Sequence, residues 1–182
     1  QSLTVDATGV VMLNGAGADV TVCSGTTYNL GSPFVAGQTY SWSPTANLSA
    51  ASVSDPVVTL VNNGATPDTL VYTVFAQNDL CTYSDVVTII VNPSPQASVP
   101  NLEPYYCAGE LITLTGAPGY EGYIWQVSDP SIVVGSAKEP TLKIQPTQPV
   151  SVSLYVSNAN CLSEPVEVPL NILTPPVVNV QG

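Results

Sequence analysis

The sequence predicts an all-β protein that consists of two tandem antiparallel β-sandwiches with about seven strands each. Three observations support this prediction. The sequence repeats with a period of about 80 residues, apolar side chains alternate with polar ones, and the turn segments are rich in Gly, Pro, Asn and Asp. The chain has 17 prolines and 13 glycines among its 182 residues, and it lacks the long apolar stripe of an amphipathic helix.

The repeat is anchored by cysteine, tryptophan and proline residues that recur in one order. The matching pairs are Cys23 and Cys107, Trp42 and Trp125, Pro56 and Pro140, and Cys81 and Cys161. They are separated by 84, 83, 84 and 80 residues. We therefore expect a first module over residues 1–93, with an extra N-terminal strand segment, and a second over 94–174. Residues 175–182 are expected to form a C-terminal strand that begins a next module or is donated to another chain.

The expected strands follow from the alternation of apolar residues. In the first module it runs through residues 28–30, 57–61 and 70–76, and a β-branched run, VVTIIV, covers 86–91. The N-terminal segment SLTVDATGVVML is long enough for one or two strands. Turn-forming sequences lie between these runs, among them LGSPFVAGQ, NNGATPD, QNDLC, NPSPQ and TGAPGYEG. The prolines are expected at strand ends and edges, where a missing N–H group costs no ladder hydrogen bond.

Each module has one tryptophan and two cysteines. A sandwich of about 80 residues buries little surface, so a large central side chain and a crosslink both stabilise it. Trp42 and Trp125 are therefore expected to be core residues. The four cysteines indicate an oxidising compartment. They do not fit zinc, because there is no C-x2-C pair and no histidine.

The cysteine pairing has two alternatives. We expect one bridge within each module, Cys23–Cys81 and Cys107–Cys161, each closing a loop of roughly 55 residues and contributing about 3–4 kcal/mol. However, a simple sandwich separates these cysteines by the length of a strand, about 20 Å, and a disulfide needs Cα atoms within about 7 Å. In the alternative, Cys23 is bonded to Cys161 across the modules. Cys81 and Cys107 then point outward toward neighbouring copies.

The charge of the chain excludes several classes of function. It has 13 acidic residues, two lysines and no histidine, and its formal net charge is −11. Phosphate binding requires clustered Lys and Arg, so nucleic acid is not an expected partner, and an anionic membrane surface would repel the chain. No apolar run is long enough for membrane insertion.

Catalysis and metal binding also lack the residues they require. Histidine is the commonest general base and metal ligand, and the scattered carboxylates show neither an acid and base pair nor the spacing of a calcium loop. We expect no enzyme activity, no cofactor and no metal, with a calcium site built from distant carboxylates at the module junction left open.

Several segments resemble the PKD-like or Ig-like repeat modules of large secreted surface proteins of the Bacteroidota. Those modules carry C-x-G before a strand, Y-x-W-x-P-x-x-x-L, an aromatic Y-x-V strand and a second cysteine. The matching residues are Cys23, Gly25, Tyr40, Trp42, Pro44, Leu48, Tyr72, Val74 and Cys81, and in the second module Cys107, Gly109, Tyr123, Trp125, Tyr155, Val156 and Cys161. The Pro and Leu that follow the first tryptophan have no counterpart in the second module.

The resemblance implies export and surface display. Such modules serve as stalks, spacers and fibres in gliding-motility adhesins and other cargo of the type IX secretion system. It also implies an O-glycosylation site at Thr69, because Asp68-Thr69-Leu70 has the D-[ST]-apolar pattern of that phylum.

We therefore expect a non-enzymatic extracellular structural or adhesive element of a bacterial cell surface. An unpaired edge strand would allow head-to-tail strand donation between copies, which gives a filament. The expected partners are other copies of the chain or neighbouring modules. The alternative is a glycan- or protein-binding accessory module of a larger secreted protein, with a ligand surface formed by Tyr105, Tyr106, Tyr120 and Tyr123.

Overall fold

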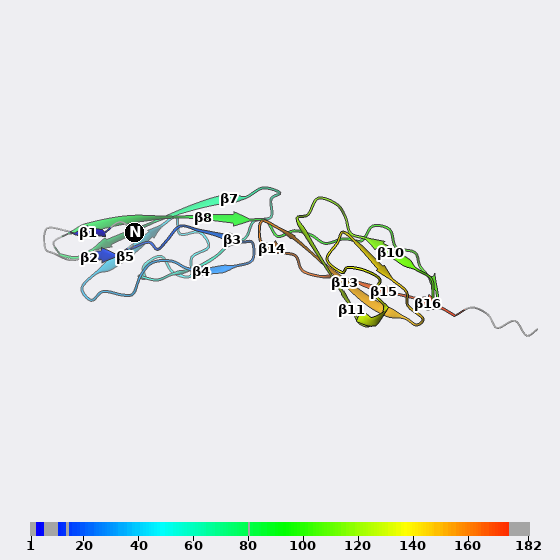
Figure 1. The fold of residues 1–182 in the computed structure, drawn as a ribbon. Helices are drawn as coiled ribbons and strands as arrows, with labels where there is room; N and C mark the ends of the chain where they lie inside the picture. The colour runs from blue at the N-terminus through cyan, green and yellow to red at the C-terminus, as the bar shows by residue number, and fades with distance from the viewer. Residues whose placement is uncertain (1–2, 6–10, 14, 80, 175–182) are drawn as a thin grey trace, which may run out of the picture. The chain divides into compact units, whose positions relative to one another are not determined.

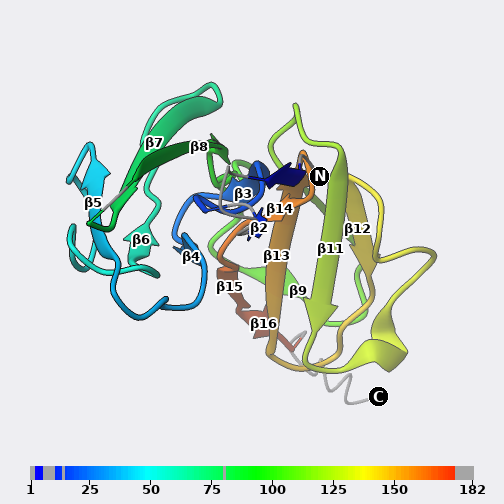
Figure 2. The same cartoon turned by 90° about the vertical axis from the view of Figure 1, so that its left-hand side faces the viewer.

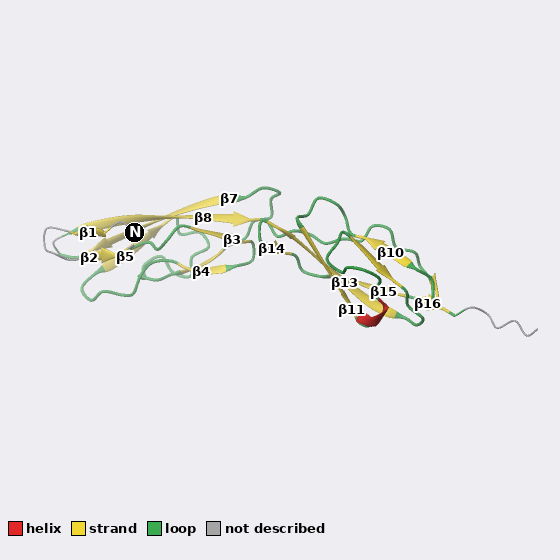
Figure 3. Ribbon diagram, viewed as in Figure 1, coloured by secondary structure: helices red, strands yellow, loops and turns green. Residues whose placement is uncertain are grey.

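The computed structural model describes residues 3–5, 11–13, 15–79 and 81–174. The chain divides into two compact units, residues 1–94 and 95–182, which we call the first and the second module. The predicted boundary was one residue earlier, and the predicted C-terminal strand over 175–182 lies outside the described residues. The described secondary structure consists of β-strands and one short 3-10 helix (Figure 3).

The first module is a sandwich of a four-stranded and a two-stranded sheet, preceded by a short hairpin of β1 (Leu3–Val5) and β2 (Val11–Leu13). The larger sheet has the order β3-β8-β7-β5 and the smaller one pairs β4 with β6. Their bounds are β3 (Val20–Cys23), β4 (Thr27–Asn29), β5 (Thr39–Ser43), β6 (Val57–Thr59), β7 (Asp68–Gln77) and β8 (Thr82–Asn92). The long hairpin of β7 and β8 runs along the module, and β3 lies parallel to β8 (Figure 1).

The second module repeats this arrangement with a divided last strand. One sheet contains β11, β13, β14 and β15, another pairs β10 with β12, and β9 lies parallel to β16. The bounds are β9 (Tyr106–Cys107), β10 (Ile112–Thr115), β11 (Gly122–Val127), β12 (Thr141–Ile144), β13 (Val150–Asn158), β14 (Cys161–Leu162), β15 (Val166–Leu170) and β16 (Ile172–Leu173). Figure 2 shows β11 and β13 side by side, as their pairing requires.

The 3-10 helix η1 (Pro130–Ile132) lies between β11 and β12. Its N-cap is Asp129, whose side chain accepts hydrogen bonds from the Ser131 hydroxyl at 2.6 Å and from the Ser131 N–H at 3.0 Å. These bonds lower the pKa of the Asp129 carboxyl, because they stabilise its charged form.

Each module has its own core, with one tryptophan in it. Trp42 and Trp125 are both 3% exposed. Trp42 shares one buried cluster with Val58 of β6, with Leu30 and Leu60, which directly follow β4 and β6, and with Val74 and Val87 of the larger sheet. The alternation predicted from sequence produces this core, since every second side chain of a strand points inward.

The surroundings of the two tryptophans are equivalent. The indole Nε1 of Trp42 donates to Val53 O and that of Trp125 donates to Glu139 O, both at 2.9 Å. Their backbone N–H groups donate to Ala51 O and Ala137 O, both at 2.8 Å. Each tryptophan therefore binds the loop that follows its strand through the same two hydrogen bonds, although only the first loop has the Pro and Leu of the sequence pattern and only the second contains η1.

One residue correspondence taken from the sequence is wrong. Tyr72 and Val74 were matched with Tyr155 and Val156, but Trp42 pairs with Val74 and Trp125 pairs with Leu154. Val152 is therefore the counterpart of Tyr72. Tyr155 lies three residues after Val152, belongs to the opposite face of β13 and is half-buried, because a shift by an odd number of residues moves a side chain to the other face of a sheet.

Candidate functional site

Cys23 and Cys81 lie at opposite ends of β8. Cys23 is in register with Asn92, the last residue of β8, whereas Cys81 directly precedes Thr82, the first. A strand rises about 3.3 Å per residue, so roughly 30 Å separate the two ends. A disulfide requires Cα atoms within about 7 Å.

Cys107 and Cys161 are separated in the same way. Cys107 is in register with Leu173 of β16, and Cys161 is in register with Asn158, the last residue of β13. The other end of β13, Val150, pairs with Leu170, which precedes β16. Cys107 and Cys161 are thus separated by at least the length of β13, which is about 25 Å.

The oxidation states of the four cysteines match these positions. Cys23 and Cys161 are disulfide-bonded, and Cys81 and Cys107 are free and exposed. The predicted bridges Cys23–Cys81 and Cys107–Cys161 are therefore wrong. The physical reason is the length of the final hairpins, which keep the two cysteines of each module at opposite ends.

The first cysteines of the two modules, Cys23 and Cys107, have the same backbone setting. Each ends a short strand and is followed by a turn with a glycine at positive φ, 88° at Gly25 and 78° at Gly109. The turns share their hydrogen bonds, which are Thr26 N to Cys23 O and Glu110 N to Cys107 O at 3.2 Å, and Gly25 N to Leu60 O and Gly109 N to Pro146 O at 2.8 Å.

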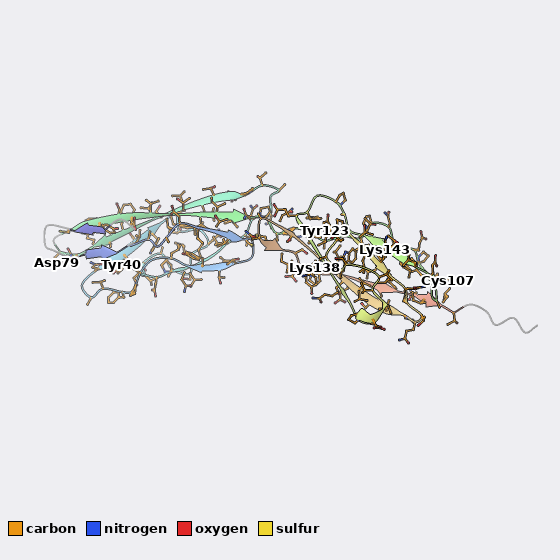
Figure 4. All side chains as sticks on the ribbon, viewed as in Figure 1. Tyr40, Asp79, Cys107, Tyr123, Lys138 and Lys143 are labelled. Carbon is orange, nitrogen blue, oxygen red and sulfur yellow. The ribbon has the colours of Figure 1, made fainter. Side chains whose placement is uncertain are left out.

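The second cysteines, Cys81 and Cys161, both directly follow the turn of a hairpin: Cys81 precedes β8, and Cys161 is the first residue of β14. Asn78 N donates to Cys81 O at 3.0 Å and Cys81 N donates to Asn78 Oδ1 at 2.8 Å. In the second module the turn consists of Ala159 and Asn160, both at positive φ, as in a type I′ turn. Figure 4 shows Asp79 at the tip of the β7–β8 hairpin, and Cys107 beside β16 in the second module.

The four tyrosines of the predicted ligand surface do not form one surface. Tyr120 and Tyr123 contact each other edge to face, with ring centroids 6.0 Å apart. Tyr123 is in register with Val156, at the Cys161 end of the module, whereas Tyr106 is in register with Ile172 at the other end. Tyr105, next to it, is exposed.

The hydroxyl groups of three of these tyrosines bind the backbone of the module. Tyr123 donates to Ala117 O at 2.9 Å and Tyr120 donates to Gln96 O at 2.5 Å. The Tyr106 hydroxyl accepts from Glu103 N at 2.9 Å. These contacts give the three side chains a structural role.

An aromatic cavity that was not predicted lies in the first module. Its volume is about 280 Å³, and it is lined by Gly15, Ser32, Pro33, Phe34, Val35, Gln38, Tyr40, Val74, Ala76 and Tyr83. Phe34 is 68% exposed, and its ring lies 6.2 Å from that of Tyr40. Burial and the neighbouring Asp85 carboxylate raise the pKa of Tyr83. The sequence indicated only a turn here, because Phe34 occurs among Gly, Ser and Pro.

The remaining predicted features have these positions. Thr69 is exposed and is the second residue of β7, so the glycosylation pattern lies at the start of a strand. In the part of the chain that the structure describes, no three His, Cys, Asp or Glu side chains lie close enough to hold a metal ion. None of the described helices has the length and apolar character needed to cross a membrane.

No protein-family profile and no curated protein sequence matches the chain. Solved structures similar to it are tandem Ig domains. The N-terminal eight Ig domains of Down Syndrome Cell Adhesion Molecule (DSCAM) isoform 1.30.30 match with a TM-score of 0.51 and 14% identity over 87% of this chain and 23% of that one. Extracellular domains 3–5 of Drosophila OTK match with a TM-score of 0.46 and 16% identity over 86% of this chain.

The titin I-band fragment I67–I69 matches with a TM-score of 0.43 and 17% identity over 87% of this chain. The chain spans 60% of the OTK structure and 64% of the titin fragment. At these identities the similarity concerns the fold alone. The protein is an all-β chain of tandem Ig-like sandwiches.

Proposed function

We propose that the chain is a non-enzymatic extracellular structural element of a bacterial cell surface, in which Ig-like modules are linked in series and copies assemble head to tail into a filament. The observation that carries this proposal is the distribution of the cysteine states. In each module, the bonded cysteine lies at the end where the chain passes to the other module, and the free cysteine lies at the opposite end.

In the first module, Cys23 is in register with Asn92, which is two residues before the module boundary. In the second module, Cys161 is in register with Asn158, whose side chain accepts from Glu121 N at 2.9 Å. The neighbouring Tyr120 hydroxyl binds Gln96 O, close to the start of the module. We therefore propose that Cys23 and Cys161 are bonded to each other, which is the second of the two pairings considered from sequence.

A covalent link between consecutive modules suits an element that transmits force. The chain also lacks the inventory of an enzyme, with no histidine and two lysines. The resemblance of its C-x-G and Y-x-W segments to surface modules of the Bacteroidota favours export through a type IX secretion system. It also favours a place among gliding-motility adhesins or similar surface fibres. The DSCAM structure, a cell adhesion molecule by name, is compatible with an adhesive role.

Electron microscopy of native cell-surface material tests the filament, with an antibody against the chain to label it. The expected result is labelled filaments whose axial repeat corresponds to one two-module chain. Labelled particles that are always single pairs of modules would contradict the proposal.

A second candidate function is a ligand-binding accessory module, and the aromatic cavity favours it. Phe34, Tyr40 and Tyr83 offer rings on which a sugar or an apolar side chain can stack. A glycan array with the purified chain tests it, with the Phe34→Ala variant as a control. Binding that the variant loses supports this function, and a blank array at high protein concentration removes the glycan version.

A further inference from the structure

We infer that Cys81 of one copy of the chain and Cys107 of the next copy form an intermolecular disulfide, which joins the copies covalently in series. The inference rests on the proposed function, because it extends the Cys23–Cys161 link to the contact between copies. The modified residues are Cys81 and Cys107, and the partner is a second copy of the chain.

The repeat provides the first argument. Each module carries a first cysteine, Cys23 or Cys107, and a second one, Cys81 or Cys161. The first cysteine of the first module, Cys23, and the second cysteine of the second module, Cys161, are oxidised. The two free cysteines are the second one of the first module, Cys81, and the first one of the second module, Cys107. A bond between Cys81 of one copy and Cys107 of another would therefore again join a second cysteine to a first one.

The local structure provides the second argument. Cys107 has the backbone hydrogen bonds of the oxidised Cys23, down to the same 3.2 Å turn contact. Cys81 lies in the same hairpin position as the oxidised Cys161. The two exposed thiols are therefore carried by backbone that already supports a disulfide elsewhere in the same chain.

The surfaces around the free thiols provide the third argument. At the Cys81 end, Tyr83 lines the aromatic cavity two residues from Cys81, about 7 Å along the strand. At the Cys107 end, several large apolar side chains are exposed, namely Leu102, Tyr105, Leu111 and Leu173. Leu173 occupies the register position that Asn92 has beside Cys23. Exposed apolar groups at both ends favour an interface, and we assign the apolar end of the next copy as the occupant of the cavity.

The bond forms by thiol–disulfide exchange with a low-molecular-weight disulfide. The thiolate of Cys81 attacks the reagent, which forms a mixed disulfide and releases one reagent thiol. The thiolate of Cys107 from the next copy then attacks the Cys81 sulfur and releases the second reagent thiol. Two protein thiols are oxidised, one reagent disulfide is reduced, and the two protons end on the released thiols.

The test uses the purified chain in a buffer of oxidised and reduced glutathione, analysed by non-reducing electrophoresis and peptide mapping. The expected result is a ladder whose steps are one chain and whose new crosslinked peptide contains Cys81 and Cys107. Cys81→Ser and Cys107→Ser should each lose every species above the dimer. A mixture of the two variants, one of them isotope-labelled, should yield the mixed dimer in excess over random pairing.

Two further variants test the interface without changing a cysteine. Phe34→Ala removes the exposed ring of the cavity and should slow growth of the ladder. Phe75→Ala is the matched control, because Phe75 is also exposed but belongs to the other face of β7 from Val74 and Ala76. All variants are checked for native tryptophan fluorescence, which the exposed positions should leave unchanged.

The outcomes separate this inference from the proposed function. Filaments in native material without a Cys81–Cys107 peptide would leave the filament intact and overturn the intermolecular bond. Mixed dimers at or below the random proportion would also overturn it. A Cys81–Cys107 ladder in native material that shows no ordered filament would support the bond and contradict the filament.

Discussion

The indole of Trp42 donates a hydrogen bond to the carbonyl of Val53, 2.9 Å away. Trp125 repeats this bond with Glu139 at the same distance. In both modules the tryptophan thus fixes the loop that follows its own strand, in addition to filling the core. The repeated tryptophan of the sequence thus has the same hydrogen-bonding role in both modules.

Replacement of this tryptophan should destabilise only its own module. Trp42→Phe leaves a smaller ring and an unpaired Val53 carbonyl, so we expect the free energy of unfolding of the first module to fall by about 2 kcal/mol. Trp125 is then the only tryptophan, and its fluorescence reports the second module during urea unfolding. The fluorescence transition of the second module should keep its urea midpoint. Circular dichroism, which reports both modules, should show an additional transition of the first module at a lower urea concentration. Equal shifts in both signals would show that the modules unfold as one unit.

Gly31 is required by a close backbone contact. Its φ is +80°, and a Cβ atom there would collide with the carbonyl oxygen of Ser54. Gly25 also has positive φ, but a Cβ atom there meets nothing. Gly25→Ala should therefore cost about 1–2 kcal/mol of unfolding free energy, and Gly31→Ala should cost at least about 2 kcal/mol more. Equal midpoints for the two variants in urea would contradict the contact.

The Tyr72 hydroxyl ties the core of the first module to the loop after β5. It donates to Ala46 O at 3.0 Å, and Tyr72→Phe should lower the free energy of unfolding by about 1 kcal/mol. Tyr105→Phe is the control, because Tyr105 is 61% exposed and should show no change. Chemical denaturation at neutral pH measures both.

The same residue predicts a loss of stability at alkaline pH. Burial raises the pKa of Tyr72 above its ordinary value of 10.0. Its contribution is therefore fully present below the pKa of the unfolded chain and is lost as pH rises above it. Urea unfolding midpoints should therefore fall less steeply with rising alkaline pH for Tyr72→Phe than for the unmodified chain. Parallel curves would contradict the raised pKa.

Charge should set the rate at which copies are linked. Cys107 is followed by Glu110, whose carboxylate accepts from Cys107 N at 3.3 Å, whereas the equivalent position after Cys23 is Thr26. The hairpin tip beside Cys81 carries Asp79. Like charges on both ends repel, and salt screens this repulsion over about 8 Å at physiological ionic strength. Glu110→Thr should therefore speed the mixed-dimer reaction about two- to fivefold at low salt. The gain should vanish at high salt, and a gain that does not depend on salt would contradict the electrostatic cause.

The fold was predictable because its signals are local. Alternation along β7 and β8, the turn residues between strands and the repeated tryptophan each act within a short segment. The tyrosine correspondence failed because Tyr155 lies three positions after Val152, the counterpart of Tyr72, and a single sequence does not reveal such a shift. The aromatic cavity was missed because Phe34 belongs to a loop, where neither periodicity nor spacing marks a side chain.

The cysteine states depended on strand length, which the sequence indicated only in part. The run VVTIIV marked only the second half of β8. The full length of β8, eleven residues, places Cys23 and Cys81 too far apart to bond. The geometric objection considered from sequence was therefore correct, and the preferred pairing within each module was not.

Disulfide mapping of native material tests the central claim most directly. The material is alkylated without reduction and digested with pepsin at acid pH, which suppresses thiol exchange, and the crosslinked peptides are identified by mass spectrometry. The account predicts that Cys23 is joined to Cys161 and Cys81 to Cys107. Peptides that join Cys23 to Cys81 or Cys107 to Cys161 would contradict it.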